Sequence, residues 1–475
     1  MDTPAIGSLL IPVENQVREL DPKLLLACIA AQRGFSCIFG PRREMHLRLA
    51  SFPRSVYLSK SITTASVKVF RILRQLGHQI VAWDEEALVH PEPEVYYARR
   101  LCPQAIRYVS HLFAWGQENA ELWRGYPQLP AATSIHVTGN PRSDLLRPEL
   151  RSFYAEDAAN IRNTYGEFIL INTNFNHVNG FVPVLNLFQP SGQPGGKPKP
   201  GRAAKGMPIE YAEGLREHKQ QIFEHFQRLI PDLDRAFPGQ TIVVRPHPTE
   251  NQDIYHAIAA RCKKVRVINE GNVVPWIMAS RALVHNGCTT GVEAYALGVP
   301  AVSYRPAVND TYDGGFYRLP NSLSHHCFDF TQLQATLRRI LSGEIGVAGD
   351  DSARMVFNRY VAAQDGPLAC ERIVAVIETS AKGAANSPAP AWHQRLAGGF
   401  AAIRRRMYKR IKAYLPAYSH NSPGFQSHRY PELSLSAVEA RISRLPSLGG
   451  RDWDLRVEHV QNQFFKISSA GAPRS

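Results

Sequence analysis

Residues 284–304 read Val-His-Asn-Gly-Cys-Thr-Thr-Gly-Val-Glu-Ala-Tyr-Ala-Leu-Gly-Val-Pro-Ala-Val-Ser-Tyr. This stretch predicts a buried strand, a polar turn, a helix that begins near Val292, a Gly-Pro break and a second buried strand. A turn of small and hydroxyl residues that leads into a helix favours anion binding, because N–H groups are unpaired there and the helix dipole attracts negative charge. We therefore expect a phosphate-binding turn that contains Asn286, Gly287, Thr289, Thr290 and Gly291.

Glu293 falls in the first turn of this helix, where its carboxylate can accept hydrogen bonds from a sugar diol. The same pattern also fits an ordinary helix start, in which Thr289 or Thr290 caps the helix and Glu293 completes the cap. We expect Cys288 to be a small buried residue without a chemical role.

A second stretch, residues 241–248, reads Thr-Ile-Val-Val-Arg-Pro-His-Pro. The β-branched run predicts a core strand that the two prolines stop. Arg245 and His247 then lie at the carboxyl end of that strand, which is where open parallel α/β sheets bind ligands. The alternative is an ordinary strand end whose histidine caps a neighbouring helix.

Together the two stretches resemble the donor half of GT-B glycosyltransferases. The likeness is greatest to bacterial capsule and surface-polysaccharide enzymes, Kdo-transferase-like enzymes among them, and CDP-glycerol phosphotransferases look similar at the same places. The residues that carry it are Arg245, His247, Pro248, 285–291, Glu293, Leu297, Gly298 and Pro300. The opening Leu-Leu-Ile-Pro-Val-Glu-Asn-Gln-Val-Arg-Glu-Leu, at 9–20, resembles proteins of surface carbohydrate biosynthesis.

The resemblance implies a GT-B fold of the α/β class, with two Rossmann-like parallel-sheet domains that face a cleft. Repeated strand–helix alternation along the chain independently predicts parallel α/β sheets. We expect an acceptor-side domain at 1–150, a nucleotide-donor domain at 151–380 and a basic helical tail at 381–475. The Pro/Gly/Lys-rich residues 189–207 are expected to form a loop, either a lid over the donor or a plain insertion.

Sugar transfer from a nucleotide requires that the leaving phosphate be stabilised and the nucleotide be held. The resemblance implies that Arg245 and His247 contact the phosphates and that Glu293 contacts the ribose. Asn172, Thr173 and Asn174, which follow a predicted strand, are candidates for the donor sugar or for simple turn chemistry. We expect no metal site and no cofactor beyond the nucleotide-sugar substrate; CMP-linked keto sugars are among the donors that the resemblance implies.

The first domain is expected to supply the base that deprotonates the acceptor. Asp84, Glu85 and Glu86 follow a predicted strand at 79–83, and crowding of like charges there would raise a carboxylate pKa. Glu14, which ends the first predicted strand, is the other candidate, and Lys60 can pair with either. The alternative is that 84–86 is the acidic start of a helix.

Composition limits the class of protein. A chain of 475 residues fits two domains, and 44% hydrophobic and 20% charged residues are typical of a globular protein. No apolar run approaches the roughly 20 residues that span a bilayer, and the N-terminus does not read as a signal peptide. The 7 cysteines include no C-x-x-C pair, which favours a reducing cytoplasmic setting over a zinc site or disulfides.

The net charge of +14 is concentrated in the tail, where residues 381–475 hold 15 Lys/Arg and 5 Asp/Glu and so supply +10. A predicted helix at 394–415 has an apolar stripe beside cations: Phe400, Ile403, Met407, Ile411, Tyr414 and Leu415. This pattern is typical of a helix that lies in an anionic membrane interface, and also of a helix packed on the body of a protein. Beyond Pro416 we expect much disorder.

The resulting hypothesis is a cytoplasmic glycosyltransferase, peripheral on the inner face of the membrane, that moves a sugar from a nucleotide donor to a lipid-linked or oligosaccharide acceptor. An NDP-sugar 2-epimerase of the same fold is one alternative. A basic nucleic-acid-binding or scaffold protein is another, although no C2H2, KH or RNP pattern is present and we expect no nucleic-acid partner.

Overall fold

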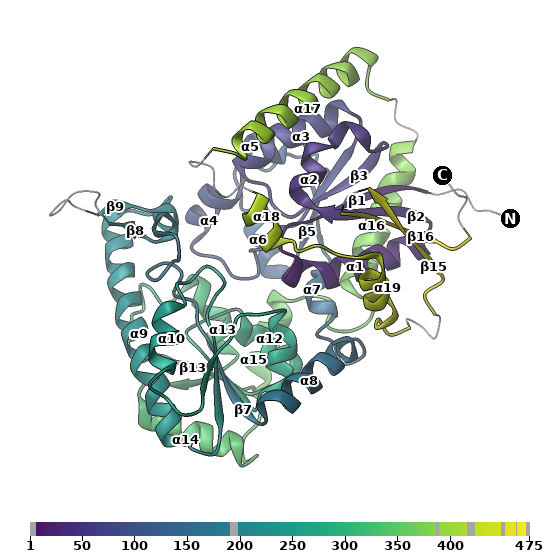
Figure 1. Cartoon of the computed structure of the whole chain (residues 1–475). Coiled ribbons are helices and arrows are strands. Elements are labelled where there is room, and N and C mark those ends of the chain that lie inside the picture. The colour runs from purple at the N-terminus through teal and green to yellow at the C-terminus, as the bar shows by residue number, and fades with distance from the viewer. Residues whose placement is uncertain are drawn as a thin grey trace. The chain divides into compact units, whose positions relative to one another are not determined.

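The computed structural model describes residues 6–190, 198–385, 389–415, 423–447, 452–461 and 463–471. They form two compact units, each built around its own sheet (Figure 1). Unit 1 comprises residues 1–88, 100–145 and 359–475, and unit 2 comprises 89–99 and 146–358. The predicted α/β class is therefore confirmed. Whereas we expected boundaries at 150 and 380, the chain leaves unit 1 after Leu145 and returns to it at Arg359.

The sheet of unit 1 has the strand order β15-β16-β2-β1-β3-β4-β5-β6, and its strands from β2 to β6 pair in parallel. Strand bounds are β1 Gly7–Val13, β2 Phe35–Pro41, β3 Ser55–Ser59, β4 Gln79–Ala82, β5 His111–Ala114, β6 Ser134–Val137, β15 Leu455–Gln461 and β16 Phe464–Ser469. Its helices are α1 Gln16–Gln32, α2 Arg42–Leu47, α3 Val67–Gln75, α5 Pro103–Ile106, α6 Gln117–Arg124, α7 Pro141–Asp144, α16 Ala369–Ala385, α17 Trp392–Lys412, α18 Pro423–Arg429 and α19 Leu435–Ser443.

The sheet of unit 2 has the order β11-β10-β7-β12-β13-β14 and is parallel throughout. Strand bounds are β7 Phe168–Asn172, β10 Thr241–Arg245, β11 Val265–Val267, β12 Ala282–His285, β13 Ala301–Tyr304 and β14 His325–Cys327; β8 Phe188–Gln189 and β9 Lys199–Pro200 form a separate ribbon. The helices are α8 Ala155–Tyr165, α9 Ile209–Ala236, α10 Asp253–Ala259, α11 Val273–Ala279, α12 Thr290–Leu297, α13 Arg318–Ser322 and α14 Phe330–Leu341, while α4 Pro93–Arg100 and α15 Asp351–Tyr360 each cross a unit boundary.

Three predicted elements differ from the structure for identifiable reasons. Asp21 and Pro22 predict a helix that starts there, but the first helix begins at Gln16, because the Glu19 carboxylate accepts the backbone N–H of Glu14 at 3.0 Å and so fixes an earlier start. The sequence over 106–114 predicts one strand, but the strand is shorter, since Pro103 opens a helical turn before β5. The sequence over 351–380 predicts helix throughout, but the helix is interrupted at 361–368, where Ala363 has φ 61° and a Gly-Pro pair follows.

The C-terminal residues pack on unit 1, contrary to the expected disorder. Strand β16 pairs antiparallel with β2, and Phe465, fully buried, stacks on Phe39 with ring centroids 5.4 Å apart. Helix α17 lies along α3 (Figure 1), and its small residues Gly398 and Ala402 face that contact. The tail therefore completes the first domain. Of the predicted loop at 189–207, residues 191–197 lie outside the described residues, and the lid role stays a prediction.

No helix among the described residues is long and apolar enough to cross a bilayer.

We predict that Phe465→Ala lowers the free energy of unfolding by about 3–5 kcal/mol, because the truncation opens a cavity beneath a stacked ring. Val460→Ala, on an exposed position of the same hairpin, is the control and should change it by less than about 0.5 kcal/mol. Urea unfolding of the full chain measures both. Equal, small effects would show that the hairpin does not belong to the core of unit 1.

Candidate functional site

The carboxyl edge of the second sheet brings the two predicted stretches together. Numbered along the chain, its strands have the order 3-2-1-4-5-6, so the strand order reverses between β7 and β12. Ligands of open α/β sheets bind at such a reversal, outside the carboxyl ends of the strands. Asn172, the last residue of β7, is the register partner of Arg245 on one side and of His285 on the other. We call this edge the donor edge.

Several buried polar atoms at the donor edge have no hydrogen-bond partner among the residues that the structure describes. Both side-chain atoms of Asn172 lack one, as do Oδ1 of Asn176, Oδ1 of Asn286 and Nη1 of Arg245. Leaving a buried polar group unsatisfied costs about 1–3 kcal/mol. Because native proteins rarely tolerate such groups, their concentration at the strand reversal indicates a site that a polar ligand completes.

His247 is held by the loop that follows β10. Its Nδ1 lies 2.8 Å from Oγ1 of Thr249 and accepts the backbone N–H of Thr249 at 3.3 Å. With Nδ1 acting as an acceptor, a neutral ring carries its proton on Nε2. The backbone N–H of His247 donates to Glu250 at 3.1 Å. The two prolines and this hydrogen bond fix the imidazole at the edge, as the sequence predicted.

Glu250 is a buried carboxylate that sequence reasoning missed. It accepts the N–H groups of His247 and Phe175 and the hydroxyls of Thr173 and Tyr255, the last at 2.6 Å. Burial raises its pKa, and these hydrogen bonds lower it in part. Glu250 thus ties the loop after β7 to the loop after β10. The sequence feature that could have identified Glu250 is its position in Arg-Pro-His-Pro-Thr-Glu, three residues after the histidine.

Arg245 is only partly available to a ligand. Its guanidinium lies 4.8 Å from the ring centroid of Trp276, and Nη2 donates to the carbonyl of Gly271 at 3.2 Å. Burial lowers its pKa to about 10, so it is still charged at neutral pH. Nη1 has no hydrogen-bond partner among the described residues.

The turn after β12 is shaped by His285, and this corrects one expectation. The backbone N–H groups of Gly287 and Cys288 donate to Nδ1 of His285, at 3.0 and 3.3 Å, so they do not face a phosphate. Nε2 of the fully buried ring donates to Ser324 at 2.8 Å. Burial lowers the pKa of His285 to about 3, which keeps the ring neutral and Nδ1 free to accept.

Two glycines of this turn are required by close approaches. Gly287 has φ +79°, and a Cβ there would lie 2.1 Å from the ring of Tyr317. A Cβ on Gly291 would lie 2.6 Å from Nε2 of His285. The predicted glycines therefore let the turn pack on two rings, rather than only bringing backbone close to a ligand.

Helix α12 begins at Thr290 without a side-chain cap, which excludes the simple capping interpretation of Thr289 and Thr290. Within the described part of the chain, no backbone acceptor is found for the N–H group of Thr289, whereas the N–H group of Thr290 hydrogen-bonds to the Cys288 thiol. Glu293 is buried one turn into the helix, and Asn174 is half-buried two residues beyond β7. The structure thus keeps one N–H group of the predicted anion turn, that of Thr289, at the helix start.

Lys219 and His177 form a second pair that the sequence did not single out. Nζ of Lys219, on α9, lies 3.2 Å from Nδ1 of His177 and 5.2 Å from the ring centroid of Tyr317. Burial lowers the pKa of Lys219 to about 8. Burial, then the charges on Lys219, Arg99 and His247, hold the pKa of His177 well below its usual range. His177 is therefore neutral, and Lys219 donates to it.

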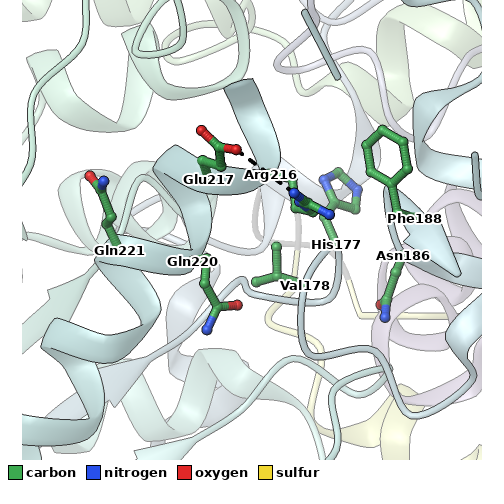
Figure 2. A pocket seen from close by; sticks show the side chains of 8 residues that line it. All are labelled: His177, Val178, Asn186, Phe188, Arg216, Glu217, Gln220 and Gln221. Carbon is green, nitrogen blue, oxygen red and sulfur yellow. Dashed lines mark ion pairs between the residues drawn. The ribbon is translucent and has the colours of Figure 1, made fainter. Parts of the chain in front are cut away.

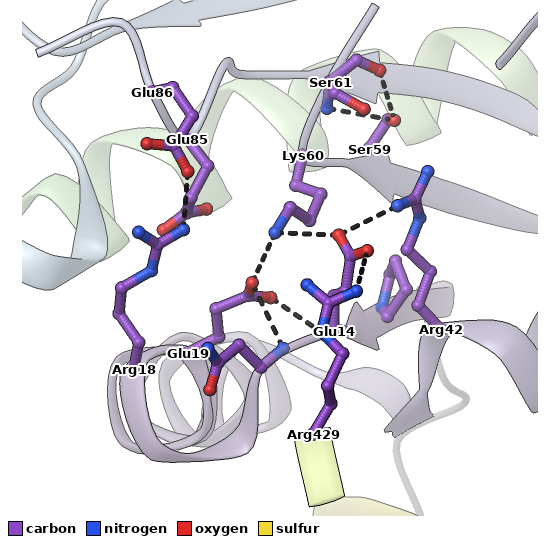
Figure 3. A network of polar contacts seen from close by, with 12 residues as sticks. Glu14, Arg18, Glu19, Arg42, Ser59, Lys60, Ser61, Glu85, Glu86 and Arg429 are labelled. Atoms are coloured by element: carbon purple, nitrogen blue, oxygen red, sulfur yellow. Dashed lines mark hydrogen bonds and ion pairs between the residues drawn. The ribbon is translucent and has the colours of Figure 1, made fainter. Parts of the chain in front are cut away.

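In unit 1 the corresponding strand reversal, between β1 and β3, holds a dense charge network, which Figure 3 shows. The Glu14 carboxylate contacts Lys60 at 3.0 Å, Arg42 at 2.9 Å and Arg429 at 2.8 Å. Burial would raise the pKa of Glu14, but these three cations hold it well below its usual range. Such a carboxylate is a weak general base, which argues against the catalytic role predicted for Glu14.

The acidic residues after β4 each have a separate partner. Asp84 accepts from Nε of Arg100 at 2.9 Å, Glu85 accepts from the indole N–H of Trp83 at 2.7 Å, and Glu86 pairs with Arg18 at 2.6 Å. Arg18 lowers the pKa of Glu86 to about 2. For Glu86, the rise in pKa expected from crowded like charges is therefore wrong. An N-terminal helix position is also wrong, since 84–88 is not helical.

We predict that His285 makes stability depend on pH. Because its folded pKa, about 3, is below that of an unfolded histidine, the unfolded chain binds the extra proton in acid. The contribution of His285 to the free energy of unfolding is complete above about pH 6.5. It is lost as the pH falls toward 3, by up to about 1.4 kcal/mol per pH unit. Urea unfolding at pH 7 and pH 5 should show a larger loss in the wild type than in His285→Asn.

His256→Asn, at an exposed position on α10, is the matched control and should keep the wild-type pH dependence. If the free energy of unfolding of His285→Asn changed with pH as steeply as that of the wild type, His285 would not be the neutral, buried hydrogen-bond acceptor assigned here.

No known family model matches this chain, and no curated protein matches it. Among solved structures, a histidine-to-alanine variant of the wall teichoic acid polymerase TagF is similar with a TM-score of 0.50 and 11% identity, over 80% of this chain and 90% of that one. UDP-GlcNAc 2-epimerases from Methanocaldococcus jannaschii and Neisseria meningitidis give TM-scores of 0.45 and 0.43 at 11% and 12% identity, each over 78% of this chain and 99% of the other. At this identity, the likeness to TagF shows a shared fold: the chain has the GT-B fold.

Proposed function

We propose that this protein is a GT-B glycosyltransferase that moves a sugar from a nucleotide donor to a lipid-linked or oligosaccharide acceptor in surface polysaccharide or capsule synthesis. The observation that carries the proposal is the set of unsatisfied buried polar atoms at the donor edge. They lie at the strand reversal of a Rossmann-type sheet, where nucleotides bind. The likeness of fold to TagF, a wall teichoic acid polymerase, agrees with this class.

In this proposal protein groups, rather than a metal ion, stabilise the leaving phosphate. Nε2 of His247 donates a hydrogen bond to the phosphate, Nη1 of Arg245 adds positive charge, and the N–H group of Thr289 binds a phosphate oxygen at the start of α12. Glu293 accepts from the ribose hydroxyls, and the amides of Asn172 and Asn286 bind the remaining polar groups of the donor. The donor sugar is a hexose or a CMP-linked keto sugar.

Of the four carboxylates considered for the acceptor side, we propose Glu85 as the base. Glu14 is held by three cations, Asp84 by Arg100 and Glu86 by Arg18. Glu85 accepts a neutral hydrogen bond from Trp83 and makes no ion pair within the described residues. It is therefore the one whose lone pairs are least engaged by cations, which suits a group that must take a proton.

Helix α17 supports a second part of the proposal, attachment to an anionic membrane from the cytoplasmic side. Its small residues face α3, while large apolar residues point outward, with Phe400 72%, Met407 61% and Ile411 64% exposed. Trp392, Leu396, Ile403 and Tyr414 extend the stripe, and cations such as Arg404, Arg406 and Arg410 flank it. An exposed apolar stripe beside cations is the pattern of an interfacial helix.

The donor site is tested by two substitutions with matched controls. His247→Ala should lower the rate of nucleotide release from a nucleotide sugar by about 10²–10⁴-fold, the usual effect of losing an acid-base group. Glu293→Ala should weaken nucleotide affinity by about 10–100-fold, because it removes hydrogen bonds to a charged group. His256→Ala and Glu213→Ala, at exposed positions of unit 2, should leave both unchanged. Wild-type rate and affinity in the first two variants would contradict the site.

The membrane part is tested by vesicle flotation of the full chain. Phe400→Ser combined with Met407→Ser and Ile411→Ser should abolish binding to phosphatidylglycerol vesicles, because the apolar area that enters the interface is lost. Met355→Ser, which replaces a 68% exposed methionine of α15, is the control and should bind as the wild type does. Flotation that is unaffected by the triple substitution would remove the membrane role.

A further inference from the structure

A cavity of about 520 Å³ lies in unit 2 beside the donor edge (Figure 2). One wall is formed by His177, Val178 and Asn186, from the segment between β7 and β8, and by Phe188 of β8. Helix α9 supplies the other, where Arg216, Glu217, Gln220 and Gln221 repeat at one-turn spacing. The volume is within the range of about 300–1,000 Å³ that small-molecule sites occupy.

The lining combines hydrogen-bond donors and acceptors with one aromatic face. Arg216 donates only, the Glu217 carboxylate accepts only, and the glutamine amides do both. The guanidinium of Arg216 lies 5.2 Å from the ring centroid of Phe188 and 3.8 Å from Glu217, so the wall charges largely compensate. Hydroxyl groups both donate and accept. A ligand rich in hydroxyls therefore matches this lining better than a nucleobase, a bare anion or an apolar group does.

His177 links the cavity to the donor edge. Because Lys219 donates to its Nδ1, the neutral ring carries its proton on Nε2, which gives the cavity wall an N–H donor. The segment that follows His177 is joined to the loop that follows His247, because the N–H group of Phe181 donates to the carbonyl of Thr249 at 2.8 Å. A ligand whose phosphates contact His247 can thus extend past His177 into the cavity.

We propose that this cavity is a subsite for the sugar or polyol part of a substrate. Arg216, Glu217 and Gln220 bind its hydroxyls, His177 donates to it through Nε2, and Phe188 packs against its C–H face. The inference rests on the proposed function, which places the nucleotide at the donor edge. The sugar can come from the donor or from the acceptor, and its binding chemistry is the same in both cases.

Calorimetry on the full chain tests the subsite in two arms. The first compares CMP with CMP-N-acetylneuraminate and UDP with UDP-glucose. The second titrates methyl glucoside and ribitol in the presence of saturating CMP or UDP. Arg216→Ala and Gln220→Ala should each weaken binding of the sugar-bearing ligand by about tenfold, the loss of one or two good hydrogen bonds, and leave CMP and UDP within about twofold. Arg228→Ala and Gln227→Ala, farther along α9 and outside the cavity lining, are the controls.

A loss confined to the first arm assigns the donor's sugar to the cavity, and a loss confined to the second assigns the acceptor's. The subsite would be overturned if Arg216→Ala and Gln220→Ala left the affinity for the sugar-bearing ligands unchanged in both arms. It would also be overturned if they lowered the affinity for CMP or UDP alone by the same factor. If the wild type binds none of the nucleotides, the proposed function fails. Methyl glucoside and ribitol, titrated without nucleotide, then test the cavity by themselves.

Discussion

Reversal of strand order in two mainly parallel sheets is the constraint on which this molecule depends. At each reversal the crossovers diverge to opposite sides, which opens a crevice between the loops that follow two neighbouring strands. Asn172 and His285 lie at the reversal in unit 2, and Glu14 and Lys60 lie at the one in unit 1. The buried imidazole of His285 then fixes the donor-side turn, since it accepts two backbone N–H groups and donates to Ser324.

Buried polar and charged groups are compensated differently at the carboxyl edges of the two sheets. In unit 1 most charges at the edge have a counter-charge: fully buried Glu19 bridges Lys23 and Lys60, and Glu14 is held by Arg42 and by Arg429 of the C-terminal α18. A ligand there gains affinity only where it replaces an existing ion pair. In unit 2 both side-chain polar atoms of buried Asn172, and Oδ1 of Asn286, have no hydrogen-bond partner among the described residues. That edge gains hydrogen bonds from a polar ligand, which is why we place the nucleotide there.

The sequence predicted what local patterns determine and missed what tertiary contacts determine. Strand Phe168–Asn172 and the break after Arg245 follow from β-branched runs and prolines, and both are present. Lys219 and Glu250 were missed because their roles depend on neighbours 42 and 75–77 residues away, His177 in one case and Thr173 and Phe175 in the other. The C-terminal hairpin was missed because its strands are stabilised by pairing with β2 and by the Phe39–Phe465 stack.

The most direct test of the donor edge is a thermal-shift measurement on the wild type and Asn172→Leu, with CMP, CDP, UDP and GDP and with duplex DNA as a control. Leucine removes an unsatisfied buried amide at similar volume, which is neutral or stabilising where no partner is lost. We expect one nucleotide to raise the Tm of the wild type, by mass action. In Asn172→Leu, the Tm without ligand should be equal or higher and that shift should be absent. A strongly destabilised variant, or a nucleotide shift that persists in it, would contradict the account.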